Sequence, residues 1–240
     1  MVMSAPELEE VIARNVSAGS SMPARAAYSS LTSIIRAFAK SYWRLDVIHP
    51  ERFPETGAFI LAPNHRSNID FMLPALATRR RVRWMAKDSI FYSGPIDRSL
   101  RGLGAFPVDR DSTDRIALRT ARDVVADGQP IVMFPEGRRK EGPTVLDMFD
   151  GPAYVSCRQR VPILPIGMGG SERAMPIGSK MIRRADVVLV VGELIYPEVP
   201  LDGRVPRSAV TEMTTRLGVA LQDLYDEARL ISEQRTARRA

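Results

Sequence analysis

The sequence predicts an α/β fold: a single domain with a largely parallel mixed sheet flanked by helices, and an amphipathic helical extension at the N-terminus. First, short apolar runs alternate with segments of helical spacing between residues 57 and 228, which is typical of parallel sheets. Second, 45% of the 240 residues are hydrophobic and 26% are charged, the balance of an ordinary globular core. Third, no low-complexity tract or long flexible linker divides the chain, so we expect one α/β domain.

The first predicted helix covers residues 28–43, where apolar side chains recur at steps of three and four. This spacing draws one stripe along a helix. The helix could pack on the domain or lie in a membrane interface, and the two interpretations are compatible. We therefore predict a helical, membrane-associating segment over residues 1–44 and an α/β domain over residues 45–235. The stripe consists of Tyr28, Leu31, Ile35, Phe38 and Tyr42.

Six apolar runs and two helical patterns follow along the chain. Strands are expected within 57–64, 81–87, 104–110, 130–137, 161–170 and 185–195. Helices are expected over 115–128 and 208–228. Two prolines, Pro162 and Pro165, fall in the fifth strand and indicate an edge position, since proline cannot donate to a central ladder.

The composition narrows the class of partner and the compartment. The net charge is +6 and the pI about 9.8, which suits anionic lipids, phosphate-bearing substrates or nucleic acid. The excess of arginine over lysine favours phosphate recognition, although a GC-rich genome would produce the same bias.

Cys157 is the single cysteine, so a disulfide within the chain is excluded and a buried apolar role is expected. The acidic first ten residues do not resemble a signal peptide, and no apolar run reaches the roughly 20 residues that span a bilayer. We expect a peripheral protein on the cytoplasmic face of a membrane.

The stretch 62–75 holds His65, one of two histidines, and Asp70 five positions later. Within one helix the two side chains would diverge by about 140°. They can meet if His65 lies in a loop and Asp70 in the first turn of the next helix, with Ser67 or Asn68 as its N-cap. The carboxylate would then orient the imidazole as a general base. A loop histidine with only a structural role is the alternative.

Two further strings place cations near the ends of predicted strands. Arg110 follows the apolar segment that begins at Gly104, and the string FPEGRRK ends the strand 130–137. Arginines beside a glycine that allows close backbone approach can cradle a phosphate. Each arginine alone could equally be a solvated surface charge.

Taken in order, four blocks make the chain resemble the glycerolipid acyltransferase family, and more narrowly the bacterial 1-acyl-sn-glycerol-3-phosphate acyltransferases. The resemblance covers about residues 45–197. An Asn-His-x4-Asp block and a glycine-to-arginine block come first, followed by a Phe-Pro-Glu-Gly block and a Val-Pro-Ile-x-Pro block. The matching positions are Asn64, His65 and Asp70; Gly104 to Arg110; Phe134 to Lys140; and Val161 to Ile166.

The resemblance implies transfer of a fatty acyl group from acyl-CoA or acyl carrier protein to a hydroxyl of lysophosphatidic acid. It implies His65 and Asp70 as the catalytic pair, a membrane surface as partner, and no metal, cofactor or nucleic acid. The acceptor-binding residues it implies are Asn64, Lys87, Arg110, Glu136, Gly137, Arg138 and Arg139.

Two departures from the family pattern leave the acceptor open. Arg138 stands where the family has threonine, Lys140 stands where it has serine, and Arg139 takes the position of the family arginine. Glycerol 3-phosphate, a lyso-aminolipid or a glycolipid could therefore replace lysophosphatidic acid. A basic membrane-surface protein without catalysis is the non-enzyme alternative, and metal-dependent hydrolysis is disfavoured because His49 and His65 lack ligand spacing.

Overall fold

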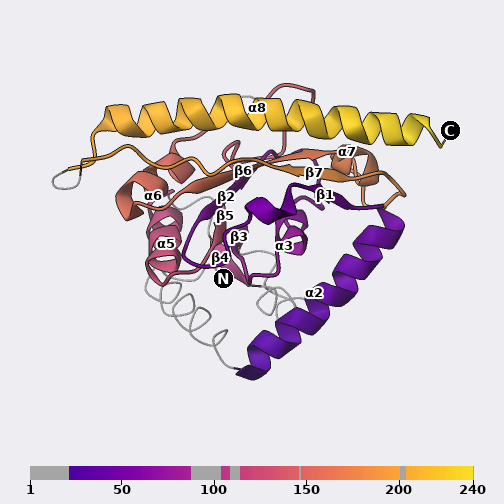
Figure 1. The fold of residues 1–240 in the computed structure, drawn as a ribbon, viewed down its shortest axis with the longest axis horizontal. Helices are drawn as coiled ribbons and strands as arrows, with labels where there is room; N and C mark the ends of the chain where they lie inside the picture. Colours follow the sequence, from indigo (N-terminus) through magenta and orange to yellow (C-terminus); the bar gives the residue numbers. More distant parts are fainter. Residues whose placement is uncertain (1–21, 88–103, 109–113, 146, 201–203, 240) are drawn as a thin grey trace.

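A computed structural model of the chain describes residues 22–87, 104–108, 114–145, 147–200 and 204–239. One seven-stranded sheet organises these residues, with the strand order β1-β7-β6-β2-β5-β3-β4. Helices lie on both of its faces, and the long α8 runs along one of them (Figure 1). The strands are β1 (Asp46–Ile48), β2 (Ile60–Pro63), β3 (Arg83–Lys87), β4 (Ala105–Val108), β5 (Ile131–Val132), β6 (Ile163–Gly169) and β7 (Val188–Val191). The helices are α2 (Met22–Tyr42), the 3-10 turn η1 (Pro50–Arg52), α3 (Leu73–Ala77), α5 (Asp114–Ala126), α6 (Gly151–Gln159), α7 (Ser171–Ala174) and α8 (Arg207–Ala237).

The sheet is mixed but largely parallel, which confirms the predicted fold class. Strands β6, β2, β5, β3 and β4 run in one direction, and β7 pairs antiparallel with β6. The prediction that β6 is an edge strand is wrong, because β6 lies between β7 and β2. The register explains how a central strand accommodates Pro165: the β7 ladder begins one residue later, at Ile166, and Pro165 only accepts a bond from the amide of Gly192 at 3.0 Å.

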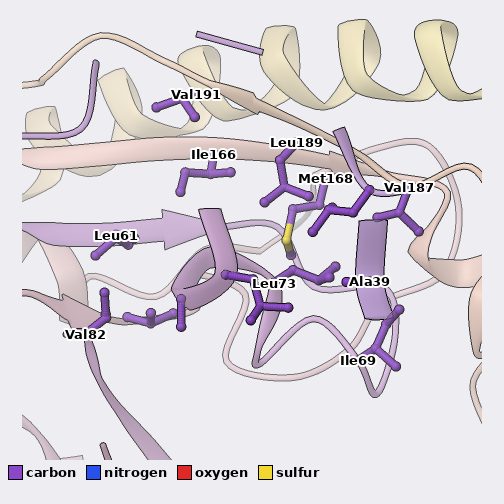
Figure 2. Close-up of a cluster of buried hydrophobic side chains, with 14 of the residues drawn as sticks. Ala39, Leu61, Ile69, Leu73, Val82, Ile166, Met168, Val187, Leu189 and Val191 are labelled. Atoms are coloured by element: carbon purple, nitrogen blue, oxygen red, sulfur yellow. The ribbon is translucent and has the colours of Figure 1, made fainter. Parts of the chain in front are cut away.

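Both faces of the sheet are buried, as parallel strands between helices require. In β2, Leu61 contributes to a core cluster with α2 and α3, while Ile60 and Ala62 contribute to a second cluster with α5, α6 and α8. Figure 2 shows the first cluster, in which Leu61, Leu73 and Ile166 lie between strands and helices. Cys157 is buried in the second cluster, as predicted.

Helix α8 lies against β6 with almost no side chain between them. A Cβ atom at Gly167 would collide with the backbone of Leu224, and one at Gly169 would collide with the backbone of Ala228. Glycine at these two positions therefore permits direct backbone contact between helix and strand. The helix extends nine residues beyond the predicted end at residue 228.

Helix α2 is longer than predicted and belongs to the core. Ala39 is buried within the helix, and Trp43, which directly follows it, is buried in the first cluster. Arg36 faces the domain and donates to the carbonyl oxygens of Leu76 and Thr78 at 2.7 Å each. The division at residue 44 therefore does not separate two packing units. No helix within the described ranges is both long and apolar enough to cross a membrane.

Candidate active site

The carboxyl ends of β2, β5, β3 and β4 meet at one edge of the sheet, since these four strands are adjacent and parallel. Open α/β sheets bind ligands outside this edge. His65 follows the end of β2, and Phe134 and Glu136 follow the end of β5. The fold thus brings together two blocks that are about 70 residues apart in sequence.

The predicted contact between His65 and Asp70 is confirmed. The distance from His65 Nδ1 to Asp70 Oδ2 is 3.0 Å, and the side chains are 14% and 0% exposed. No described residue forms a hydrogen bond with the other ring nitrogen, Nε2. A carboxylate that accepts from Nδ1 fixes the tautomer in which Nε2 can accept a proton.

The turn around Asp70 differs from the prediction, because Asp70 precedes the helix. Helix α3 begins only at Leu73, and Pro74 in its first turn suits a start at that point. Asp70 Oδ2 instead accepts the amide hydrogens of Arg66 and Ser67, at 2.5 and 2.6 Å. One carboxylate oxygen therefore holds the backbone of the turn as well as the imidazole.

Two residues that follow β5 support His65 from the other side. The Phe134 ring stacks on the imidazole, with 4.2 Å between ring centroids and 27° between planes. Glu136 Oε2 accepts the backbone N–H of His65 at 2.9 Å, and the carbonyl oxygen of His65 accepts the amide of Lys140 at 2.9 Å. Stacking and backbone bonds together limit rotation and displacement of the imidazole.

Arg66 connects these parts, and the sequence analysis missed it. Its side chain is 1% exposed and forms an ion pair with the fully buried Glu136, with Nη1 2.6 Å from Oε2. The other guanidinium donors reach the carbonyl oxygens of Gly142 and Thr144 at 3.2 and 3.0 Å, and the guanidinium lies over the Tyr225 ring of α8. Burial alone would lower the pKa of Arg66, but the hydrogen bonds and charge of Glu136 outweigh it and raise the pKa. The guanidinium is therefore charged at every pH at which the protein folds.

The cationic turn, defined here as Gly137, Arg138 and Arg139, is exposed directly beside this network. Gly137 has a φ of 65°, a conformation that favours glycine. Neither arginine side chain makes an ion pair with another described residue, whereas Lys140 lies 3.5 Å from Asp147. Two exposed guanidinium groups in a turn that is bonded to the backbone of His65 through Lys140 suit an anionic ligand.

Asn64 and Glu136 need correction as substrate-binding residues, because both are fully buried with their polar atoms in use. The Asn64 side chain accepts the amide of Met168 at 2.6 Å and donates to the carbonyl of the same residue at 3.1 Å. It fastens the end of β2 to β6, while Glu136 holds Arg66 and the His65 backbone. Lys87 ends β3, two strands from β2, and Arg110 lies outside the described residues.

An apolar cavity of about 260 Å³ lies between α2, α3 and β3. Phe71, which directly follows Asp70, lines it together with Trp84 of β3, and their ring centroids are 4.8 Å apart. Ile35 and Phe38 of α2 form part of the opposite wall. A partly open apolar space beside the turn that holds His65 and Asp70 suits a hydrocarbon chain.

Comparison with known proteins assigns the class that this fold and site define. The model of the acyltransferase family matches residues 44–169, which contain His65, Asp70 and the cationic turn. The chain therefore belongs to the acyltransferase family.

Individual relatives are more distant. The chain is 22% identical to a 1-acyl-sn-glycerol-3-phosphate acyltransferase of Bacillus subtilis, over 62% of this chain and 73% of the relative. It is 24% identical to a chloroplastic enzyme of the same name from Brassica napus, over 65% of this chain, and matches only 46% of that relative's length. The crystal structure of the 1-acyl-sn-glycerophosphate acyltransferase PlsC from Thermotoga maritima shares the fold, with a TM-score of 0.68 and 22% identity over 92% of this chain and 88% of that one.

Proposed function

We propose that the protein transfers a fatty acyl group from a thioester donor to the free hydroxyl of 1-acyl-sn-glycerol 3-phosphate, producing phosphatidic acid. The observation that carries this proposal is the 3.0 Å pairing of His65 with Asp70 inside an acyltransferase domain. The names of the relatives from Bacillus subtilis and Brassica napus support the choice of acceptor.

In the proposed reaction, His65 Nε2 removes the proton of the acceptor hydroxyl while its oxygen attacks the thioester carbonyl. The carbon–sulfur bond then breaks, and the thiolate leaves with a proton returned from the imidazolium. Asp70 stabilises the imidazolium and keeps its orientation. A positioned base of this kind contributes about 10²–10⁴-fold in rate, and holding both substrates together contributes much of the remainder.

The substrates divide between the two neighbouring regions of the site. The acceptor phosphate lies on the cationic turn, where Arg138 and Arg139 are exposed. The family resemblance adds Lys87, at the end of β3, and Arg110 as further cations. The donor acyl chain enters the apolar cavity, and acyl-CoA and acyl carrier protein are both candidate donors. A peripheral position on the cytoplasmic face of a membrane, and a reaction without metal or cofactor, complete the proposal.

An acceptor panel with radiolabelled palmitoyl-CoA tests this function. Lysophosphatidic acid is expected to be the best acceptor, ahead of glycerol 3-phosphate, a lyso-aminolipid and a glycolipid.

His65→Ala and Asp70→Asn should each lower turnover by about 10²–10⁴-fold, whereas His49→Ala, at the other and partly exposed histidine, should match the wild type. Arg139→Ala should raise the acceptor KM. Equal acyl transfer by wild type and His65→Ala would refute the mechanism, and a preference for another acceptor would replace lysophosphatidic acid.

A further inference from the structure

Another cavity, of about 710 Å³, lies between α5, α6 and the start of α8. These three elements are grouped at the end of the molecule that is farthest from α2 and α7 (Figure 1). Leu118, Val205 and Val210 supply apolar parts of its lining. The volume lies within the range of about 300–1,000 Å³ that is typical of small-molecule sites. The acyl-transfer reaction proposed above leaves this cavity without a role.

Three arginines line the cavity: Arg158 in the last turn of α6, and Arg204 and Arg207 at the start of α8. All three are exposed, and none forms a hydrogen bond or an ion pair with another described residue. Asp150 also lines the cavity, and it accepts the hydroxyl of Thr214 at 2.7 Å. Three guanidinium groups therefore face one carboxylate, and they can offer planar pairs of donors to phosphate oxygens.

The position of two of these cations is unfavourable for the helix unless an anion lies beside them. Arg207 is the first residue of α8, and its N-cap Pro206 provides no side-chain hydrogen bond. The first turn contains no acidic residue. Because a helix N-terminus carries partial positive charge, nearby cations are repelled by it and nearby anions are attracted. An anion in the cavity would reverse the sign of this interaction.

The remaining lining indicates what kind of anion fits. Tyr154, a half-buried residue of α6, adds an aromatic ring to the cavity. A single phosphate would leave most of a space of this size unfilled, whereas a nucleotide also brings a planar base for the ring and a sugar for the apolar side chains. We propose that this arginine cleft, defined by Arg158, Arg204, Arg207 and Tyr154, binds an adenine nucleotide that carries more than one phosphate.

Two sources could supply such a nucleotide: the coenzyme A part of an acyl-CoA donor, which rests on the proposed function, and a free nucleotide, which does not. The position of the cleft is compatible with the donor. The amide of Phe149, next to Asp150, donates to the carbonyl oxygen of Pro135 at 2.8 Å, in the segment that supports His65. Along α8, the rise from Thr214, beside Asp150, to Tyr225, beside Arg66, is about 16 Å. An extended pantetheine arm separates a thioester from its first phosphate by a distance of this order.

Isothermal titration calorimetry of the full chain tests the cleft, with adenosine 3′,5′-bisphosphate and ATP as probes. Wild-type protein should bind at least one of them, and high salt should weaken that binding. The arginine variant, which combines Arg158→Gln, Arg204→Gln and Arg207→Gln, should weaken the binding at least about 100-fold, because three charge-assisted contacts are lost. Tyr154→Leu should weaken it several-fold.

The matched control combines Lys180→Gln, Arg183→Gln and Arg184→Gln. It removes the same number of charges from exposed positions in the loop after α7, and it should bind both probes as the wild type does. The cleft would be refuted if the wild type bound neither probe, or if the arginine variant and the control bound equally well.

Kinetics with two donors identify the source of the nucleotide. If coenzyme A occupies the cleft, the arginine variant should raise the KM for palmitoyl-CoA but not for palmitoyl-pantetheine, which has no nucleotide. If a free nucleotide occupies it, ATP binding should be lost in this variant while the KM for palmitoyl-CoA is unchanged. Nucleotide binding without acyl transfer from any donor would overturn the proposed function and leave the cleft standing. If the arginine changes impaired only the use of acyl carrier protein, the surface would be a protein-docking site and the nucleotide proposal would be wrong.

Discussion

Among the described residues, two fully buried carboxylates, Glu136 and Asp186, each form a close pair with an arginine, and the two pairs serve different parts of the molecule. Arg66 and Glu136 lie beside His65 with side chains 1% and 0% exposed. Arg44 and Asp186 lie beside β1 and β7, the first two strands in the sheet order, with side chains 29% and 1% exposed. Both pairs are close, at 2.6 and 2.7 Å.

The difference lies in what each guanidinium holds. Arg44 uses Nε and Nη2 on the two oxygens of Asp186, which joins the segment after α2 to the segment before β7. Arg66 bonds to Glu136 and also to the carbonyl oxygens of His65, Gly142 and Thr144. Burying an ion pair contributes little net stability, although removing one partner is costly. The comparison therefore indicates that Arg44 stabilises the fold by joining two distant segments, whereas Arg66 positions the turn that carries His65.

The largest effect is expected from Arg66→Met. It should destabilise the fold by about 3–5 kcal/mol, because Glu136 is left charged and buried, and lower acyl transfer at least about 100-fold, because a small displacement of catalytic groups has that effect. Urea unfolding and turnover on lysophosphatidic acid measure the two losses separately.

The double variant Arg66→Met with Glu136→Gln is the control for this result. Removing both charges should restore part of the stability. Turnover should stay low because the carbonyl oxygens of Gly142 and Thr144 lose their bonds to Arg66, although Tyr225 still donates to Gly142. Recovery of turnover in step with stability would reduce Arg66 to a structural residue.

Arg44→Met should have the next largest effect, and on stability alone. The free energy of unfolding should fall by about 1–3 kcal/mol, because the buried Asp186 carboxylate loses its closest partner. Arg239 at 3.7 Å and Thr236 at 3.3 Å remain beside it. The kcat and the acceptor KM of the folded fraction should not change. A lowered kcat at a temperature where the variant is fully folded would contradict the comparison.

The Arg44 pair should also set part of the acid stability. The hydrogen bonds and charge of Arg44 lower the pKa of Asp186 against the opposing effect of burial. A carboxylate with a lowered folded-state pKa stabilises the fold above its unfolded pKa, about 3.9, and loses that contribution as the pH falls through the folded-state value. Urea unfolding measured from about pH 6 down to about pH 2 gives the free energy of unfolding at each pH. Below pH ~4 this free energy should fall less steeply in Arg44→Met than in the wild type, by up to about 1.4 kcal/mol per pH unit. Parallel curves for the two proteins would show that Asp186 titrates without help from Arg44.

Gly137→Ala should have the smallest effect. It tests the role of the cationic turn, which directly follows Glu136, the ion-pair partner of Arg66. Its positive φ costs an alanine about 1 kcal/mol, and the new methyl would press on the ring of Phe149, which is exposed and can move. We expect a several-fold rise in the acceptor KM with kcat nearly unchanged, measured by varying lysophosphatidic acid. Gly57→Ala is the matched control, because its φ is also positive and no atom lies within 4 Å of the added methyl.

The sequence predicted the site best where a motif directly follows a predicted strand, as the Asn-His-x4-Asp and Phe-Pro-Glu-Gly blocks do. A parallel sheet brings the ends of its neighbouring strands together, so His65 and the segment after β5 could be placed at one edge before any coordinates. The contact between His65 and Asp70 followed from the residue types and from the break between loop and helix. The helix start was misplaced because Asp70 bonds to the amides of Arg66 and Ser67 instead of capping a helix.

The supporting residues were beyond local patterns. Arg66 looks like any loop arginine in sequence, and only the tertiary fold brings Glu136 and Tyr225 to it. The one available signal was a cation next to the histidine together with the glutamate of the Phe-Pro-Glu-Gly block. Pro165 misled the position of β6, because the end of the antiparallel ladder depends on β7, which is more than 20 residues away.

The backbone contact between β6 and α8 has a mechanical consequence for the whole domain. With glycines at 167 and 169 against the backbone of Leu224 and Ala228, helix and strand touch directly at these two positions, so no side chain there can repack. On the opposite face, α2 is joined to α3 by side chains: Arg36 donates to two carbonyl oxygens, and Ala39 packs in the first core cluster. When a ligand enters the cavity between α2, α3 and β3, we therefore expect α8 and β6 to keep their relative position.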